Sequence, residues 1–115
     1  MATIICKDIN DDFRLITLSG RLDVHGTEAI EKEFAALAQA GKRNIAADLG
    51  TVTFLSSVGI RMLIASAKAL KEQGGRMVLI VGANDFAIKT LKSVCADSIM
   101  PMFEQFAQAE VFLKT

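Results

Sequence analysis

The feature that most constrains the fold is an unbroken apolar run at residues 77–81, which reads Met-Val-Leu-Ile-Val. A strand with one wet face alternates apolar and polar residues, whereas a strand covered on both faces is apolar throughout. Strands of the second kind occur mostly in parallel sheets whose faces are covered by helices. The run therefore predicts an α/β fold in which this segment is a central strand.

The flanking segments alternate between strand-like and helical patterns. Partly β-branched runs at 3–8 and 13–19 surround Asn10-Asp11-Asp12, which predicts a hairpin. A third strand is expected at 44–49, and a last one at 100–103, at a sheet edge that tolerates Pro101. Apolar residues recur at helical spacing in four further segments. The expected helices span residues 27–40, 57–73, 84–96 and 105–113.

Capping residues predict the helix ends: Thr27 and Asn84 are expected N-caps, and Gly41 and Gly74 follow helix ends. The element order is β-β-α-β-α-β-α-β-α. This order predicts a mixed, mainly parallel sheet of about five strands with four helices, mostly on one face. At 115 residues, the chain suits one domain, residues 1–115.

Charge and aromatic content argue against nucleic acid as a partner. The chain has 13 basic and 13 acidic residues, and its large aromatic residues are seven Phe, without Trp or Tyr. Nucleic-acid binders usually carry a basic stripe with interleaved aromatic residues. A balanced charge also gives no attraction to an anionic membrane surface. We therefore expect a protein partner.

The two cysteines and the apolar runs limit other functions. Cys6 and Cys95 lack metal-ligand spacing and lie among apolar residues, so we expect buried, reduced thiols and no metal or cofactor. The apolar runs fall short of the ~20 residues that span a bilayer. The first residues lack a basic stretch followed by a long apolar run, so no signal peptide is expected. We predict a cytoplasmic protein without membrane insertion.

Two serines at the predicted start of the second helix are the main candidates for function. Ser56 and Ser57 fall where the first backbone N–H groups lack helical partners. A serine there ordinarily caps the helix, contributing ~1 kcal/mol. The same N–H groups and the helix dipole also favour a phosphate. A phosphoryl group on Ser57 would add a charge of about −1.5 to −2 without unfolding the helix.

Gly59, Arg61 and Met62 follow these serines. Gly59 is either an ordinary loop-to-helix glycine or a small residue that lets a partner backbone come close. Arg61 and Met62 fit the inward-facing stripe of the helix poorly. We therefore expect them to be exposed and to belong to a docking surface, although ordinary solvent-facing residues would give the same pattern.

The segment 48–60 resembles the signature of the STAS family, which includes bacterial anti-sigma-factor antagonists. Ser57 falls on the phosphorylatable serine of the signature. Asp23 falls on an acidic position that lies near that serine in the family. Element order extends the resemblance over essentially the whole chain. The other matching residues are Gly20, Leu22, Asp48, Leu49, Val52, Phe54, Leu55, Gly59 and Ile60.

The resemblance implies a binding module and phosphorylation substrate, not an enzyme. The unphosphorylated form would bind an anti-sigma factor that is also a serine kinase, and would free the sigma factor. Phosphorylation of Ser57 would end binding, and a serine phosphatase would restore it. Many relatives have Asp where Ser56 stands, so Ser56 is the alternative phosphorylation site. The expected partner-binding residues are Asp23, His25, Ser56, Ser57, Val58, Gly59, Arg61 and Met62.

Other functions fit the sequence less well. A STAS accessory subunit with a constitutive partner, such as a lipid-transport ABC ATPase, would use the same helix with a structural Ser57. A hydrolase triad of Ser57, His25 and Asp23 lacks the Gly-x-Ser-x-Gly turn. The loop at 82–84 lacks both GxGxxG and GK[ST], so nucleotide binding is not expected.

Overall fold

A computed structural model describes residues 2–39 and 41–114. Its elements follow the predicted order, with a short 3₁₀ helix, η1, before the last strand. The predicted end of the first helix, Ala40, lies outside the described residues. The elements are β1 (Thr3–Asp8), β2 (Phe13–Leu22), α1 (Val24–Gln39), β3 (Asn44–Leu55), α2 (Ser57–Glu72), β4 (Arg76–Ile80), α3 (Asp85–Ser93), η1 (Ala96–Ser98), β5 (Met102–Phe103) and α4 (Phe106–Lys114).

The sheet in the described part of the chain has five strands in the order β1-β2-β3-β4-β5. β1 is antiparallel to β2, and the other neighbours are parallel, which confirms the mixed, mainly parallel prediction. The hairpin turn forms as expected, because the Asn10 side chain accepts from the Asp12 N–H at 2.9 Å. The apolar run enters β4, whose residues 77–80 are all buried.

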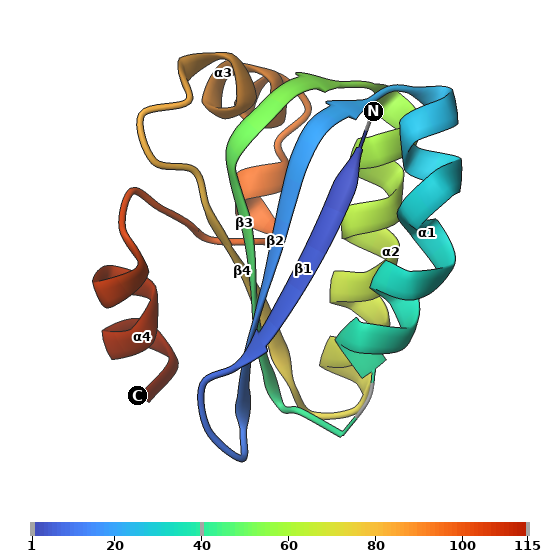
Figure 1. Cartoon of the computed structure of the whole chain (residues 1–115). Coiled ribbons are helices and arrows are strands. Elements are labelled where there is room, and N and C mark those ends of the chain that lie inside the picture. The colour runs from blue at the N-terminus through green and yellow to red at the C-terminus, as the bar shows by residue number, and fades with distance from the viewer. Residues whose placement is uncertain (1, 40, 115) are drawn as a thin grey trace.

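Helices cover both faces of the sheet, unequally (Figure 1). α1 and α2 lie on one face, and their Phe34 and Leu63 share a core with Leu91 of α3. α4 lies on the opposite face, where Ala109 and Leu113 pack in a second, smaller cluster. The prediction of helices mostly on one face therefore describes the larger core, and α4 is the exception.

β3 is twice the predicted length, because it continues through the segment expected to be a loop. It runs to Leu55, and it pairs with β2 along its whole length with two register shifts. β2 also runs on to Leu22, and Gly20 between the shifts has φ +87°. A left-handed glycine allows such an irregularity at little cost. Residues 50–54 have a loop-like sequence, but they form a strand because they pair with β2. A local sequence pattern cannot show such pairing.

The first helix begins three residues before the predicted Thr27 cap. The Asp23 carboxylate accepts from the Gly26 N–H at 2.8 Å, as an N-cap residue does. Thr27 lies within α1, fully buried, and its hydroxyl has no hydrogen-bond partner among the described residues. The predicted cap was therefore wrong. The prediction for α3 was right, because Asn84 accepts from the Ala87 N–H at 3.2 Å.

The prediction of buried cysteines was wrong. Cys6 and Cys95 are both free and exposed. Cys6 lies on β1, an edge strand whose residues are almost all exposed. Cys95 lies beyond the end of α3, where φ is +59° and the chain leaves the helix. The apolar neighbours of these cysteines are therefore a poor guide, because an edge strand and a helix end both turn side chains to solvent.

Candidate functional site

The candidate site forms where the parallel strands β2 and β3 end. Leu22 and Leu55 are partners at the ends of these strands, so Asp23 and Ser56 follow directly from paired positions. The beginnings of α1 and α2 and the whole of α3 lie at this end of the sheet (Figure 1). Ligands and partners of open α/β sheets commonly bind at the carboxyl ends of the strands.

Ser56 is the N-cap of α2, and its hydroxyl is fully engaged. Its Oγ donates to the Leu22 carbonyl oxygen at 2.6 Å and accepts from the Gly59 N–H at 3.2 Å. Its backbone N–H also donates to the Leu22 carbonyl oxygen, at 3.0 Å. The Ser56 side chain therefore joins the end of β2 to the first turn of α2.

Ser57 differs from Ser56 in every respect that matters for modification. It is the first residue of α2 and is exposed. Within residues 2–39 and 41–114, its hydroxyl has no hydrogen-bond partner. Val58 is half-buried beside it, and Arg61 is exposed one turn further along α2. Residues four apart are neighbours on a helix surface, so Arg61 lies on the side of Ser57.

Gly59 and Met62 do not lie on the exposed surface. Gly59 is buried, and a Cβ there would lie 3.1 Å from both the Leu22 Cβ and its carbonyl oxygen. Its small size therefore serves packing of α2 against β2, not the approach of a partner backbone. Met62 is only 5% exposed and belongs to the main core, so its predicted exposure was wrong. α1 packs on α2, which widens the buried stripe beyond the sheet-facing side.

Asp23 is held in place by hydrogen bonds to its carboxylate. The Gly26 N–H and, secondly, the Arg21 guanidinium lower the pKa of the Asp23 carboxyl below its ordinary value, against an opposing effect of burial. The Arg21 Nε to Asp23 Oδ2 distance is 3.4 Å. Asp23 is therefore ionised at neutral pH. His25, the second residue of α1, is exposed next to it.

Arg21, Phe54 and Phe86 form an aromatic ledge beside Asp23 that the sequence pattern did not predict. The Arg21 guanidinium lies over the Phe54 ring, 4.7 Å from its centroid. Phe54 stacks on Phe86, with centroids 6.2 Å apart, and Phe86 is 45% exposed. Arg21 meets Phe54 because they are partners in β2 and β3. A longer predicted β3 would have revealed this pairing.

The geometry offers no arrangement for hydrolysis or metal binding in the described residues. Ser57 Oγ is not bonded to His25, and the Asp23 carboxylate bonds to Gly26 and Arg21 instead. His, Cys, Asp and Glu side chains do not gather there in groups of three or more that could hold a metal ion. Helices long and apolar enough to cross a membrane are also absent from this part of the chain.

A family model named STAS domain matches residues 5–109. The chain belongs to the STAS family. It is 33% identical over 75 residues to BtrV of Bordetella bronchiseptica, whose name assigns it provisionally to the anti-sigma factor antagonists; this covers 65% of each chain. The matched segment thus spans slightly less than two thirds of that relative.

Two solved structures have the same fold. A Mycobacterium paratuberculosis anti-sigma factor antagonist superposes with a TM-score of 0.88 at 21% identity, over 100% of this chain and 96% of that one. SpoIIAA, a Bacillus cell fate determinant solved in its phosphorylated form, superposes with a TM-score of 0.68 at 19% identity, over 93% and 96%. These likenesses show that the described chain shares the fold of these two proteins.

Proposed function

We propose that this STAS domain is an anti-sigma-factor antagonist whose binding is controlled by phosphorylation of Ser57. The names of its relatives support the antagonist role, and one structural neighbour was solved in a phosphorylated form. The observation that carries the proposal is the difference between the two serines. The Ser57 side chain is exposed and unbonded, whereas the Ser56 hydroxyl is tied to Leu22 and Gly59.

The start of α2 can accept a phosphoryl group without unfolding. Free N–H groups and the positive end of the helix dipole favour the negative charge there. The exposed Arg61 guanidinium can pair with the phosphate from one turn away. Because the Ser56 cap stays bonded to Leu22, the added group leaves the β2–α2 junction intact. Phosphorylation therefore changes the surface and keeps the fold.

We place the docking surface for the anti-sigma factor on the exposed side chains around Ser57. Val24 is 49% exposed and Phe86 45% exposed, so each offers apolar area that a partner can cover. Asp23, His25 and Arg61 supply charged or polar groups at the rim. Gly59 and Met62 support this surface from within. A partner in contact with Ser57 would have to bury the added phosphate.

The loss of binding follows from charge and bulk at the interface. A phosphoryl group brings about −1.5 to −2 charge to the paired strand ends, where the ionised Asp23 also lies. To lower occupancy from about 90% to 10%, phosphorylation must weaken binding about a hundredfold. Binding would take the phosphate out of water against a partner surface without a cation. This desolvation cost is large enough to weaken binding a hundredfold. The anti-sigma factor acting as the serine kinase, a resetting phosphatase and a cytoplasmic location complete the proposed cycle.

The test compares serine variants as substrates of an anti-sigma serine kinase from the same organism, with ATP and Mg²⁺. The wild-type chain should gain about 80 Da, the mass of one phosphoryl group. Ser57→Ala should abolish this gain, and the matched variant Ser56→Ala should retain it. A gain that persists in Ser57→Ala but disappears in Ser56→Ala would assign the site to Ser56 and contradict the proposal.

The same surface also suits a permanent partner, because Val24 and Phe86 expose apolar area next to a properly capped helix. This is the STAS accessory-subunit alternative, with an ABC ATPase as the constitutive partner and Ser57 as a structural residue. Calorimetric titration of the phosphorylated and unphosphorylated chain with the partner separates the two. Equal affinities would favour the accessory subunit, and a hundredfold difference would favour the switch.

A further inference from the structure

The outer edge of β4 is only partly covered by β5. β5 has two residues, with Leu79 opposite Met102 and Ile80 opposite Phe103. On this side, the Leu79 N–H donates to the Pro101 carbonyl oxygen, and the Val81 N–H donates to the Phe103 carbonyl oxygen. Alternate residues of a strand present their N–H and C=O groups to the same edge. The backbone of Met77 therefore faces the same side as that of Leu79.

The row of hydrogen bonds between β4 and the β5 segment stops at Pro101 and does not reach Met77. The next bond of the parallel pattern would run from the N–H of residue 101 to the Met77 carbonyl oxygen, and proline has no N–H. In the described part of the chain, neither the N–H nor the C=O of Met77 has a hydrogen-bond partner on this edge. Such a pair of unmet groups is a template for another strand.

A groove of about 380 Å³ opens along this edge. Its walls come from the second half of α2, the segment before β5, and α4. Ile99, which is 42% exposed, comes from the segment before β5, and Lys68 and Lys71 come from α2. Of its described lining residues, three are basic and none is acidic. The lining residues are Ala67, Lys68, Lys71, Gly75, Arg76, Met77, Val78, Ser98, Ile99, Pro101 and Phe112.

Arg76 makes the α4 wall a fixed part of the groove. Its guanidinium donates to the Leu113 carbonyl oxygen at 3.1 Å and lies over the Phe112 ring, 5.1 Å from the centroid. α4 is thereby attached to the beginning of β4. The groove thus combines a strand edge, apolar walls and positive charge in a preformed site.

We propose that this groove binds an extended acidic segment of a partner protein, which adds to the sheet as a strand beside Met77. The unmet N–H and C=O of Met77 favour a polypeptide over a lipid, because only a backbone offers a donor and an acceptor at strand spacing. Lys68, Lys71 and Arg76 select acidic side chains by charge. Residues 76–78 have no strand partner in β5, and they would pair with about three residues, or ~10 Å, of an added strand.

The probe is a synthetic octapeptide of alternating valine and glutamate, titrated into the ¹⁵N-labelled full chain and followed by NMR. The amide signals of Met77, Val78 and Ile99 should shift together. Hydrogen exchange of the Met77 amide should slow at least about tenfold at saturation, because it becomes bonded. An octapeptide of alternating valine and lysine should bind more weakly, because the groove is positive.

Two controls separate strand addition from attraction between charges. The valine–glutamate peptide with alternate backbone nitrogens methylated keeps its charge but loses strand hydrogen bonds, so it should not protect the Met77 amide. The variant Lys68→Glu plus Lys71→Glu should weaken binding about tenfold. The matched variant Lys89→Glu plus Lys92→Glu changes the net charge equally on α3, outside this groove, and should weaken it much less.

Three results would overturn the proposal. The first is an absence of shifts at Met77, Val78 and Ile99 with the glutamate peptide. The second is equal binding of the methylated peptide, or equal weakening by the two double variants. The third is protection of the Met77 amide without any peptide, together with a dimeric mass by light scattering. That outcome would assign the groove to a second copy of this chain.

Discussion

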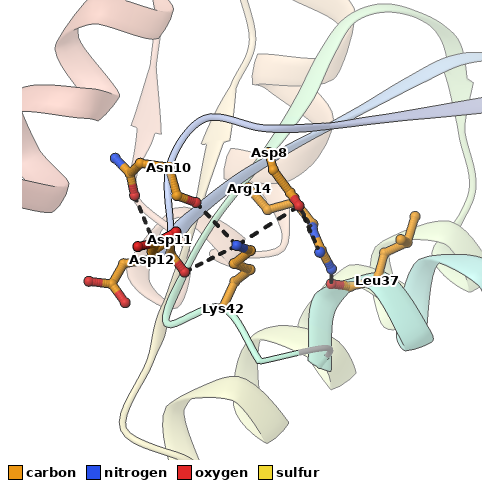
Figure 2. Close-up of polar contacts among 7 residues, drawn as sticks. All are labelled: Asp8, Asn10, Asp11, Asp12, Arg14, Leu37 and Lys42. Atoms are coloured by element: carbon orange, nitrogen blue, oxygen red, sulfur yellow. Dashed lines mark hydrogen bonds and ion pairs between the residues drawn. The ribbon is translucent and has the colours of Figure 1, made fainter.

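The two ends of the sheet are held together by different means. At the amino ends of β2 and β3, charged side chains make the connections, as Figure 2 shows. Arg14 is 9% exposed, and its guanidinium donates to Asp8 at 2.6 Å and to the Leu37 carbonyl oxygen of α1 at 2.8 Å. Lys42 donates to the carbonyl oxygens of Asn10 and Asp11.

The carboxyl end is held instead by close backbone packing and small residues. A Cβ on Gly26 would overlap the Arg21 carbonyl oxygen, and a Cβ on Gly59 would crowd Leu22. The Ser56 hydroxyl closes the junction with Leu22. Because these contacts use backbone and buried groups, the side chains of Ser57, His25 and Arg61 remain on the surface. An end built this way is rigid and still has side chains free to bind.

Substitution of Gly26 tests the close packing directly and should have the largest effect. Gly26→Ala forces a methyl group into the Arg21 carbonyl oxygen, so it should lower the free energy of unfolding by about 3 kcal/mol. Urea denaturation measures this change. Gly74→Ala is the control, because Gly74 has φ +85° and open space around its Cβ position. It should cost only about 1 kcal/mol, and equal costs for the two variants would contradict tight packing at α1.

Substitution of Arg14 removes the side-chain hydrogen bonds at the amino ends of the strands. Arg14→Met should lower the free energy of unfolding by about 2 kcal/mol, because it leaves Asp8 and the Leu37 carbonyl oxygen without their donor. Partner binding at Ser57 should be unchanged. Arg61→Met makes the same substitution at an exposed position, so it should change stability by less than about 0.5 kcal/mol and weaken partner binding. Loss of partner binding in Arg14→Met would show that the two ends are not independent.

The cost of Arg14→Met should also depend on pH. The Arg14 hydrogen bond lowers the pKa of the Asp8 carboxyl, with smaller contributions from the charges of Arg14 and Lys42. A lowered folded-state pKa gives stability that is present above the unfolded value and lost as pH falls through the folded one. The difference between wild type and Arg14→Met should therefore shrink from pH 7 towards about pH 2. A difference that is constant over this range would exclude a contribution from the ionised Asp8.

At the carboxyl end, Ser56 and Ser57 allow the cost of losing a bonded hydroxyl to be compared with that of losing an exposed one. Ser56→Ala should cost about 1 kcal/mol in urea denaturation, because it removes a cap that bonds to both Leu22 and Gly59. Ser57→Ala should change stability by less than about 0.5 kcal/mol, because its hydroxyl is unbonded. The two variants remove the same atom, the hydroxyl oxygen, at adjacent positions in the chain. A larger cost for Ser57→Ala would mean that its hydroxyl is structural.

Thr27 tests the cost of an unpaired polar group inside α1. Its hydroxyl is buried without a partner among the described residues, so Thr27→Val should raise the free energy of unfolding by up to about 1 kcal/mol. Thr27→Ser keeps the hydroxyl and removes the methyl group, so it should be destabilising by about 1 kcal/mol. Thermal denaturation ranks the three proteins. A Thr27→Val protein less stable than Thr27→Ser would show that the hydroxyl is bonded in solution.

Local pattern was a good guide where the interactions are local or the apolar signal is strong. The apolar run at 77–81 predicted a buried parallel strand, and β4 lies between β3 and the two-residue β5 with residues 77–80 buried. The Asn10 turn and the Asn84 cap depend on bonds within a few residues, and both form. β3 beyond residue 49 was missed because its strand structure depends on β2, more than thirty residues away.

The candidate site was predicted in outline and corrected in detail. Asp23 and Ser56 directly follow the paired residues Leu22 and Leu55, and the functional roles expected for them and for Ser57 stay predictions. The helical period placed Met62 outside, but α1 packs on α2 and buries it. The ledge of Arg21, Phe54 and Phe86 escaped prediction because it joins β2, β3 and α3.

The amino-acid sequence by itself determined the types and order of the elements, and it put two serines at the start of a helix. It could not choose between them, because either serine can cap a helix from the same local pattern. The tertiary structure makes Ser56 the cap of α2. The carbonyl oxygen of Leu22, at the end of a strand distant in sequence, takes the hydroxyl of Ser56 and leaves that of Ser57 in solvent.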